Sequence, residues 1–135
     1  MSDNVFLPVD SCIYDPLYDL HRREPPRWLE ESLVRYGVQV PLTGIEKEDG
    51  VVLLSGFRRY RAALSAQCDT IPVRCISPNT SPSDALALAL HLARDQRFLP
   101  LMCRVRLVQA AHLLCTSPRA WLHKNTEWLE IPVRG

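Results

Sequence analysis

The stretch Ser55-Gly56-Phe57-Arg58-Arg59-Tyr60-Arg61-Ala62-Ala63 decides how the rest of the chain is interpreted. The apolar residues 51–55 predict a strand, and residues 58–66, rich in Ala, Leu and Arg, predict a helix. Gly56 therefore stands at a strand-to-helix junction, at the start of the helix. A glycine there lets the backbone approach a ligand closely. The N–H groups of the first helical turn also carry the positive end of the helix dipole.

Three arginines follow this glycine at once. Guanidinium groups can grip phosphate oxygens in pairs, and residues three positions apart lie on a similar helix face. We therefore predict a phosphate cradle that consists of Ser55, Gly56, Arg58, Arg59 and Arg61. The alternative is that the arginines form only a solvated helix face, as charge runs on helices usually do, and their spacing alone does not decide between the two.

Length and composition fit one globular domain. The chain has 135 residues and 47% hydrophobic residues, enough for a single core. A net charge of +1 excludes nucleic-acid binding by bulk electrostatics, so any phosphate contact must come from a local cluster. The five cysteines are widely spaced without a C-x-x-C pair, which predicts no metal site, reduced thiols and a cytoplasmic location. No stretch of apolar residues is long enough to span a membrane, so we expect no membrane partner.

Periodicity and turn signals predict an α/β (α+β) domain, in which a small mixed sheet of three to five strands packs against helices. A helical tail begins at about residue 84. The helix over 84–94 has apolar residues nearly all round, which predicts burial on most sides. We divide the chain into a domain over 1–115 and a C-terminal helix over 116–135. The other expected elements are an arm over 1–26 with one short strand near 12–14, a helix over 27–36 closed by Gly37, strands over 41–45 and 71–76, and a helix that ends near 115.

Three motifs in order resemble the ParB N-terminal domain of the ParB/sulfiredoxin superfamily. The run 56–64 resembles its G-E-R-R-x-R-A-A motif, and Thr70-Ile71-Pro72-Val73 resembles the T-x-[VI]-P-[AV] stretch that follows. Upstream, residues 29–33 through Gly37 to Pro41-Leu42 are similar to L-x-E-S-I, then G, then Q-P-[IL]. The match covers about residues 12 to 114. It implies a ParB/sulfiredoxin-like fold and a site for nucleotide phosphates.

The resemblance also implies a second motif, E-N-x-x-R, which falls on Leu90-His91-Leu92-Ala93-Arg94. Arg94 keeps the arginine and joins the expected phosphate-binding residues, whereas Leu90 and His91 replace the Glu and Asn. Because hard divalent cations prefer oxygen ligands, this change argues against a role for magnesium, and we expect weak or absent nucleotide hydrolysis. The expected cofactor is a nucleotide, CTP or ATP.

Two further departures concern Phe57 and the N-terminal arm. ParB proteins have Glu at the position of Phe57 and sulfiredoxin has its catalytic Cys there, so sulfiredoxin activity is not expected. Arg22 and Arg23 correspond to the arm that contacts the nucleotide in ParB proteins, although the Gln-Pro that precedes the arginine is missing. No catalytic residue is assigned.

Three functions stay open on the sequence. The first is a nucleotide-binding module in DNA partition or gene regulation, with a nucleotide or phosphate as ligand, DNA bound through regions outside this chain, and a second copy in a homodimer. The second is a phosphotransferase or nuclease-like enzyme, which needs a general base or a metal-binding carboxylate, and only Glu30, Glu31 and Asp95 are near candidates. The third is a protein-interaction domain that has lost its ligand.

Overall fold

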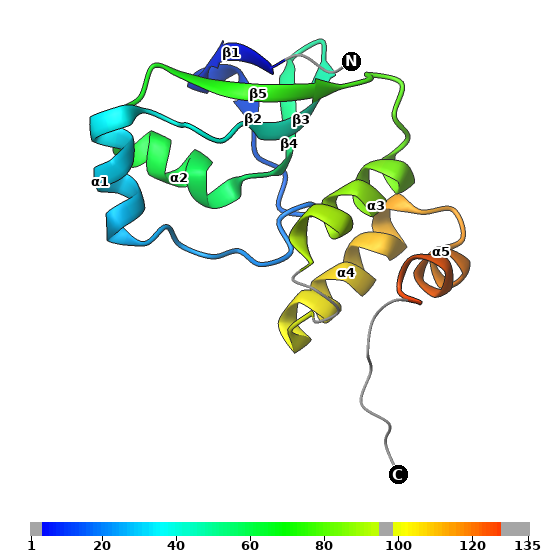
Figure 1. Cartoon of the computed structure of the whole chain (residues 1–135). Coiled ribbons are helices and arrows are strands. Elements are labelled where there is room, and N and C mark those ends of the chain that lie inside the picture. Colours follow the sequence, from blue (N-terminus) through cyan, green and yellow to red (C-terminus); the bar gives the residue numbers. More distant parts are fainter. Residues whose placement is uncertain (1–3, 95–98, 128–135) are drawn as a thin grey trace.

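A mixed five-stranded sheet lies along one end of the molecule, at the top of Figure 1, with the helices below it. The computed structural model describes residues 4–94 and 99–127. Neighbouring strands pair antiparallel (β1 with β5 and β3 with β4) or parallel (β5 with β3 and β4 with β2). The strands are β1 (Asn4–Pro8), β2 (Cys12–Ile13), β3 (Leu42–Lys47), β4 (Gly50–Ser55) and β5 (Thr70–Ile76), in the order β1-β5-β3-β4-β2.

Helices make up most of the remainder, and they confirm the expected α+β class with a helical C-terminal part. A short 3-10 turn, η1, links β1 to β2. The helices are α1 (Arg27–Tyr36), α2 (Phe57–Ser65), α3 (Pro82–Ala93), α4 (Leu101–Leu114) and α5 (Pro118–Asn125), and η1 is Val9–Ser11. Within the described ranges, no helix is long and apolar enough to cross a membrane.

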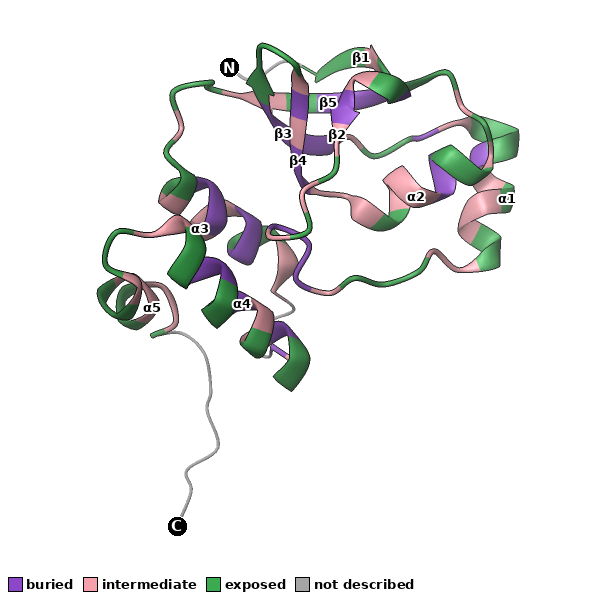
Figure 2. Ribbon diagram, turned by 180° about the vertical axis from the view of Figure 1, so that it is seen from behind, coloured by how far each residue is buried: buried purple, intermediate pink, exposed green. Residues whose placement is uncertain are grey.

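Strand β4 is buried on both faces, which explains its unbroken apolar run. Val51 and Leu53 belong to a core shared with α1 and α2. Leu54 belongs to a second core shared with α3 and α4, and Val52 packs against that core. Because side chains alternate along a strand, one short segment joins both cores and places its end, Ser55, between them. Figure 2 shows buried residues on β4 and on the helices at either side.

The ends of two helices follow from local sequence. Gly37 ends α1 at φ 71°, and its N–H bonds the carbonyl oxygen of Leu33 at 2.9 Å, as expected for a glycine C-cap. Ser81 begins α3, where its Oγ accepts a hydrogen bond from the N–H of Asp84 at 3.2 Å. Pro82 occupies the first helical position.

Two expectations were wrong in detail. The arm holds a second strand, β1, which pairs with β5 from Asn4↔Arg74 to Pro8↔Thr70. Its residues are mostly exposed, so it lacks the alternating pattern by which a strand is recognised. Helix α3 is buried on one side only, because Leu92 is 41% exposed. Ala and Leu favour helices wherever they lie, so composition alone could not tell a buried helix from a half-covered one.

The last described helix packs onto α3 and α4. The indole Nε1 of Trp121 donates a hydrogen bond to the carbonyl oxygen of Ser83 at 3.0 Å, and Trp121 and Leu122 contact the core beneath α3. The expected helix over 116–135 ends at Asn125 in the structure, and residues 128–135 lie outside the described residues. The boundary at residue 115 stays a prediction.

The double burial of β4 predicts that both of its inner leucines are essential for stability. Leu53 and Leu54 are 0% and 1% exposed. We expect Leu53→Ala and Leu54→Ala each to lower the free energy of unfolding by about 2–5 kcal/mol in urea titrations, because each leaves a cavity. Leu113→Ala, at a side chain that is 71% exposed, is the matched control and should change it by less than about 0.5 kcal/mol. Equal effects at all three positions would contradict the two-core description.

Candidate functional site

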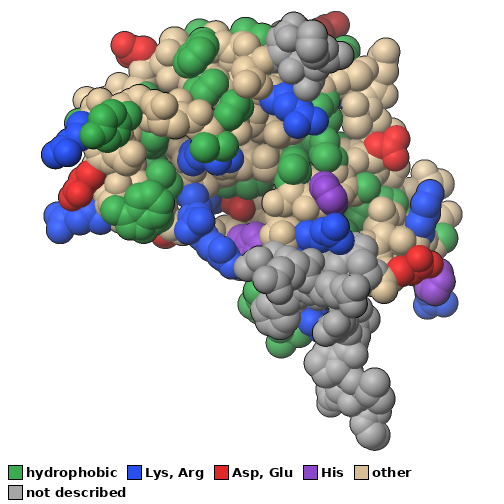
Figure 3. Space-filling view, in the orientation of Figure 1, with side chains coloured by type: hydrophobic (Ala, Val, Ile, Leu, Met, Phe, Trp, Pro, Cys, Tyr) green, Lys and Arg blue, Asp and Glu red, His purple; other side chains and the backbone are tan. Residues whose placement is uncertain are grey.

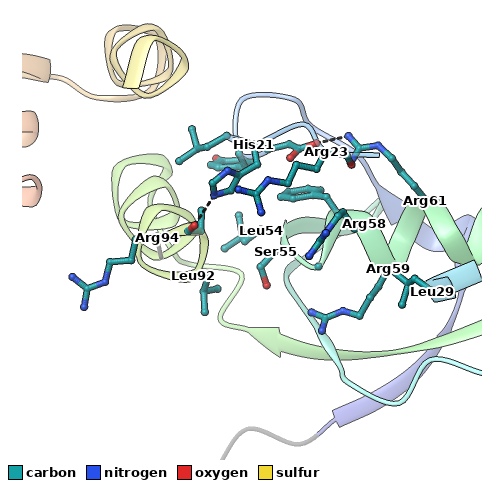
Figure 4. A pocket seen from close by; sticks show the side chains of 16 residues that line it. His21, Arg23, Leu29, Leu54, Ser55, Arg58, Arg59, Arg61, Leu92 and Arg94 are labelled. Atoms are coloured by element: carbon teal, nitrogen blue, oxygen red, sulfur yellow. Dashed lines mark hydrogen bonds and ion pairs between the residues drawn. The ribbon is translucent and has the colours of Figure 1, made fainter. Parts of the chain in front are cut away.

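A pocket of about 350 Å³ lies where the end of β4, the start of α2, the arm and the end of α3 meet (Figure 4). Basic side chains surround a hollow on this face of the molecule (Figure 3). The pocket brings together most residues that the sequence nominates for phosphate binding, and arm residues that it does not. The lining residues are Tyr18, Asp19, Leu20, His21, Arg23, Leu29, Leu54, Ser55, Gly56, Phe57, Arg58, Arg59, Arg61, Leu92, Ala93 and Arg94.

Gly56 fixes the geometry of the strand-to-helix junction. It begins α2 in the left-handed conformation, at φ 83° and ψ 24°, where residues with a side chain are strained. A Cβ built on Gly56 would lie 2.6 Å from Cγ of Leu42 and 3.1 Å from Nη2 of Arg59. The position therefore excludes larger residues on two independent grounds. The first turn of α2 consequently opens onto the pocket beside Ser55, which is half-buried.

Arg58 and Arg59 extend from α2 into the pocket (Figure 4). Arg58 is exposed, whereas Arg59 is mostly covered and its Nη2 makes only a long contact, 3.5 Å, to the carbonyl oxygen of Pro41. The Nε of Arg59 is buried and finds no hydrogen-bond partner within the part of the chain that the structure describes. Burial, and then the like charge of Arg58, lower the pKa of Arg59. A buried donor without an acceptor is costly, so this pair is suited to an anion.

Arg61 also lines the pocket, but its guanidinium group turns to the arm (Figure 4). It forms an ion pair with Asp19 and donates a hydrogen bond from Nη1 to the carbonyl oxygen of Arg23 at 2.9 Å. Burial alone would lower its pKa, yet the hydrogen bond and the charge of Asp19 raise it above the ordinary value. The structure therefore places Arg61 beside the cradle while its charge is balanced by a carboxylate.

Asp19 is the residue that the sequence analysis missed. It is 2% exposed, and it is the one carboxylate that lines the pocket among the described residues. Its Oδ1 accepts a hydrogen bond from the N–H of Arg22 at 3.0 Å, and its Oδ2 accepts one from the hydroxyl of Tyr14 at 2.8 Å. Together with the ion pair to Arg61, these contacts occupy both carboxylate oxygens. No sequence signal links residues so far apart in the chain.

The other candidate carboxylates do not reach the pocket. Glu30 and Glu31 lie on α1, half-buried and exposed respectively, and neither contributes to the lining. Asp95 lies outside the described residues. Among the described residues, no group of three or more His, Cys, Asp or Glu side chains could hold a metal ion.

The arm contributes Arg23 and His21 but not Arg22. Arg22 is exposed and directs its Nη2 to the carbonyl oxygen of Pro16 at 3.4 Å. His21 lies between helices, with Nε2 at 2.6 Å from the carbonyl oxygen of Ala93 and Nδ1 at 3.3 Å from Sγ of Cys103. Since the carbonyl oxygen can only accept, Nε2 of His21 donates this hydrogen bond.

The second motif diverges from the cradle. Arg94 follows the last residue of α3, and its side chain points away from Arg58 and Arg59 (Figure 4). It also lines a smaller depression of about 180 Å³ together with His91 and Lys124. Leu90 is buried in the core of α3 and α4, so it is a packing residue here.

Phe57 lies at the position where the resembling families carry an acidic or thiol side chain. Its ring meets that of Tyr14 edge to face, with centroids 5.8 Å apart and planes at 88°. It also packs against both cores. The ring therefore supports the arm against α2 and offers no ionisable group to the pocket.

Solved structures of ParB proteins have a similar fold at low sequence identity. The C-terminally truncated chromosome-partitioning protein ParB from Caulobacter crescentus, complexed with CTP-gamma-S, aligns over 95% of this chain and 72% of that one, with 17% identity and a TM-score of 0.56. The same protein complexed to the centromeric parS site aligns over 90% and 64%, with 17% identity and a TM-score of 0.51. The Pnob8-like ParB-N domain aligns over 93% and 50%, with 17% identity and a TM-score of 0.61.

Sulfiredoxin from Arabidopsis thaliana covers a smaller part, 56% of this chain and 85% of that one, at 26% identity and a TM-score of 0.48. No protein-family model and no curated protein sequence matches the chain. The mixed sheet and its helices thus have a fold similar to that of the ParB N-terminal domains. CTP-gamma-S and the parS site are ligands of the Caulobacter protein.

The buried donor on Arg59 predicts that function and stability oppose each other at this residue. We expect Arg59→Met to melt at or above the melting temperature of the parent, because it removes a desolvated charge beside Arg58 while keeping most of the side-chain volume. Inorganic phosphate should raise the melting temperature of the parent and leave that of Arg59→Met unchanged. A large destabilisation by Arg59→Met would instead assign Arg59 to the core.

Proposed function

We propose that this domain binds the phosphate groups of a nucleotide, CTP or ATP, at the start of α2. The observation that carries the proposal is the buried, unpartnered Nε of Arg59 in a pocket that also holds Arg58 and the left-handed Gly56. Phosphate oxygens would accept from the arginines and from the N–H groups of the first helical turn, and their charge would relieve the repulsion between Arg58 and Arg59.

Binding is favoured over catalysis by the chemistry of the pocket. A phosphotransferase or nuclease needs a general base or a carboxylate that can hold a metal ion. The carboxylate that lines the pocket, that of Asp19, already accepts hydrogen bonds on both oxygens and is paired with Arg61. An enzyme of the same superfamily therefore remains the second candidate, and it would require a base supplied from elsewhere.

The third hypothesis, a protein-interaction domain that has lost its ligand, has less support from the pocket. In that case the arginines would diverge into solvent, where each would be hydrated. Arg94 does point away, but Arg58 and Arg59 share one pocket, and Arg59 is desolvated there without an acceptor for its Nε. A lost ligand would leave no reason to retain this unfavourable arrangement.

The biological setting of the proposal is DNA partition or gene regulation in the cytoplasm. The support is the fold, which is shared with chromosome-partitioning ParB, and the five unpaired cysteines, which fit a reducing compartment. In this proposal, DNA is bound by regions outside this chain, and the domain pairs with a second copy of itself in a homodimer.

Calorimetric titration with CTP and ATP tests the cradle. Arg58→Ala and Arg59→Ala should each weaken binding about ten- to a hundred-fold, the loss of a charge-assisted hydrogen bond worth roughly 1.5–3 kcal/mol. Arg35→Ala and Arg119→Ala are the matched controls, since both arginines are exposed and lie outside the pocket. An Arg59→Ala variant that is folded and binds as tightly as the parent would refute the assignment.

A second prediction concerns magnesium. Because both oxygens of Asp19 are occupied and Leu90 is buried, the described part of the site offers no free carboxylate for a metal ion. We expect the same nucleotide affinity with saturating magnesium as with EDTA, and no release of phosphate above background. Rapid magnesium-dependent release that Arg59→Ala abolishes would favour the enzyme instead.

A further inference from the structure

The network around Asp19 binds the arm to α2 through one buried charge. The Asp19 side chain is 3% exposed, and a buried carboxylate is strongly unfavourable unless it is paired and hydrogen-bonded. Here it receives Arg61, the Tyr14 hydroxyl at 2.8 Å and the N–H of Arg22 at 3.0 Å. The partners come from the arm itself and from a helix 42 positions later in the chain.

The guanidinium group of Arg61 donates hydrogen bonds to several arm residues at once. Besides Asp19, Nη1 donates to the carbonyl oxygen of Arg23 at 2.9 Å, and Nη2 donates to the hydroxyl of Tyr14 at 3.1 Å. Its guanidinium carbon also lies 5.3 Å from the centroid of the Tyr14 ring. A side chain with these contacts on three arm residues is fixed in direction, and that direction is away from Arg58 and Arg59 (Figure 4).

The same contacts also fix the backbone of the loop over 19–23, which borders the pocket. Arg22 adopts a left-handed conformation, φ 52°, which is uncommon for a residue with a side chain. The Asp19 carboxylate accepts a hydrogen bond from the N–H of Arg22, and Arg61 donates one to the carbonyl oxygen of the following residue, Arg23. The Arg23 side chain lines the pocket.

We infer that Arg61 and Asp19 are positioning residues, which fix the loop over 19–23 so that Arg23 becomes the third cation of the phosphate site. This inference rests on the proposed function. It replaces the expectation that Arg61 itself grips phosphate with an indirect role, and it gives a physical reason why Arg23, of the two arm arginines expected to contact the ligand, lines the pocket.

Asp19→Asn gives opposite results under the two roles. If the carboxylate acts only through its charge, its removal from the wall of an anion pocket should strengthen the binding of CTP. If it positions Arg23, its removal should weaken CTP binding by about tenfold, the loss of one charge-assisted contact. Calorimetry on the folded variant decides by the direction of the change, and an equal or tighter affinity overturns the inference.

A double-mutant cycle separates positioning from general damage. In the Asp19→Asn background, Arg23→Ala should cost less than about twofold further, since Arg23 is already displaced. Arg58→Ala should keep its full effect in the same background, because Arg58 lies on α2 and is not held by Asp19. If both costs shrink together, or if neither does, Asp19 has no specific role toward Arg23 and the inference fails.

Tyr14→Phe provides the same test if Asp19→Asn does not fold. Tyr14 is partly exposed, and the change removes only the hydroxyl that bridges Asp19 and Arg61. We expect a smaller loss of CTP affinity in the same direction, again with a reduced cost for Arg23→Ala. A parent protein that binds no CTP, ATP or inorganic phosphate would overturn both proposals, whereas a parent that binds with an unaffected Tyr14→Phe variant would overturn the positioning role alone.

Discussion

The left-handed backbone at Gly56 is the constraint on which the site depends. It turns the chain from β4, buried on both faces, directly into α2, and leaves no space for a side chain against Leu42. Because β4 joins two cores, its end is fixed by packing on both sides. The first turn of α2 is therefore held rigidly, and a phosphate site built there needs little rearrangement to bind.

The described lining of the pocket contains more positive than negative charge. Asp19 neutralises Arg61, while Arg58 and Arg59 face each other's charge and one donor stays buried without an acceptor. Proteins tolerate such local cost where a ligand later relieves it. The arginines of α2 therefore differ: Arg61 is balanced by Asp19 on the arm, whereas under the proposed function an anion would balance Arg58 and Arg59.

Local patterns predicted most elements and nominated the residues at the start of α2 that line the pocket, whereas long-range pairing produced what they missed. The helix over 27–36, the Gly37 cap and the Gly56 junction each follow from neighbouring residues. Strand β1 exists through its pairing with β5, and the Arg61–Asp19 pair joins residues 42 positions apart, so neither leaves a pattern in the sequence. The helical spacing of Arg58 and Arg61 was correct, but which way Arg61 turns depended on a carboxylate whose position only the fold could give.

A ¹H–¹⁵N chemical-shift titration with CTP tests the central claim most directly, because it observes the backbone of α2 and the Nε–H of Arg59 at once. The account predicts that the largest shifts occur at the amides of Gly56, Phe57 and Arg58 and at Nε of Arg59, the buried donor that would gain an acceptor. Inorganic phosphate should move the same signals in the same direction. Shifts confined to α4 and α5, or none at the start of α2, would contradict a phosphate site at this junction.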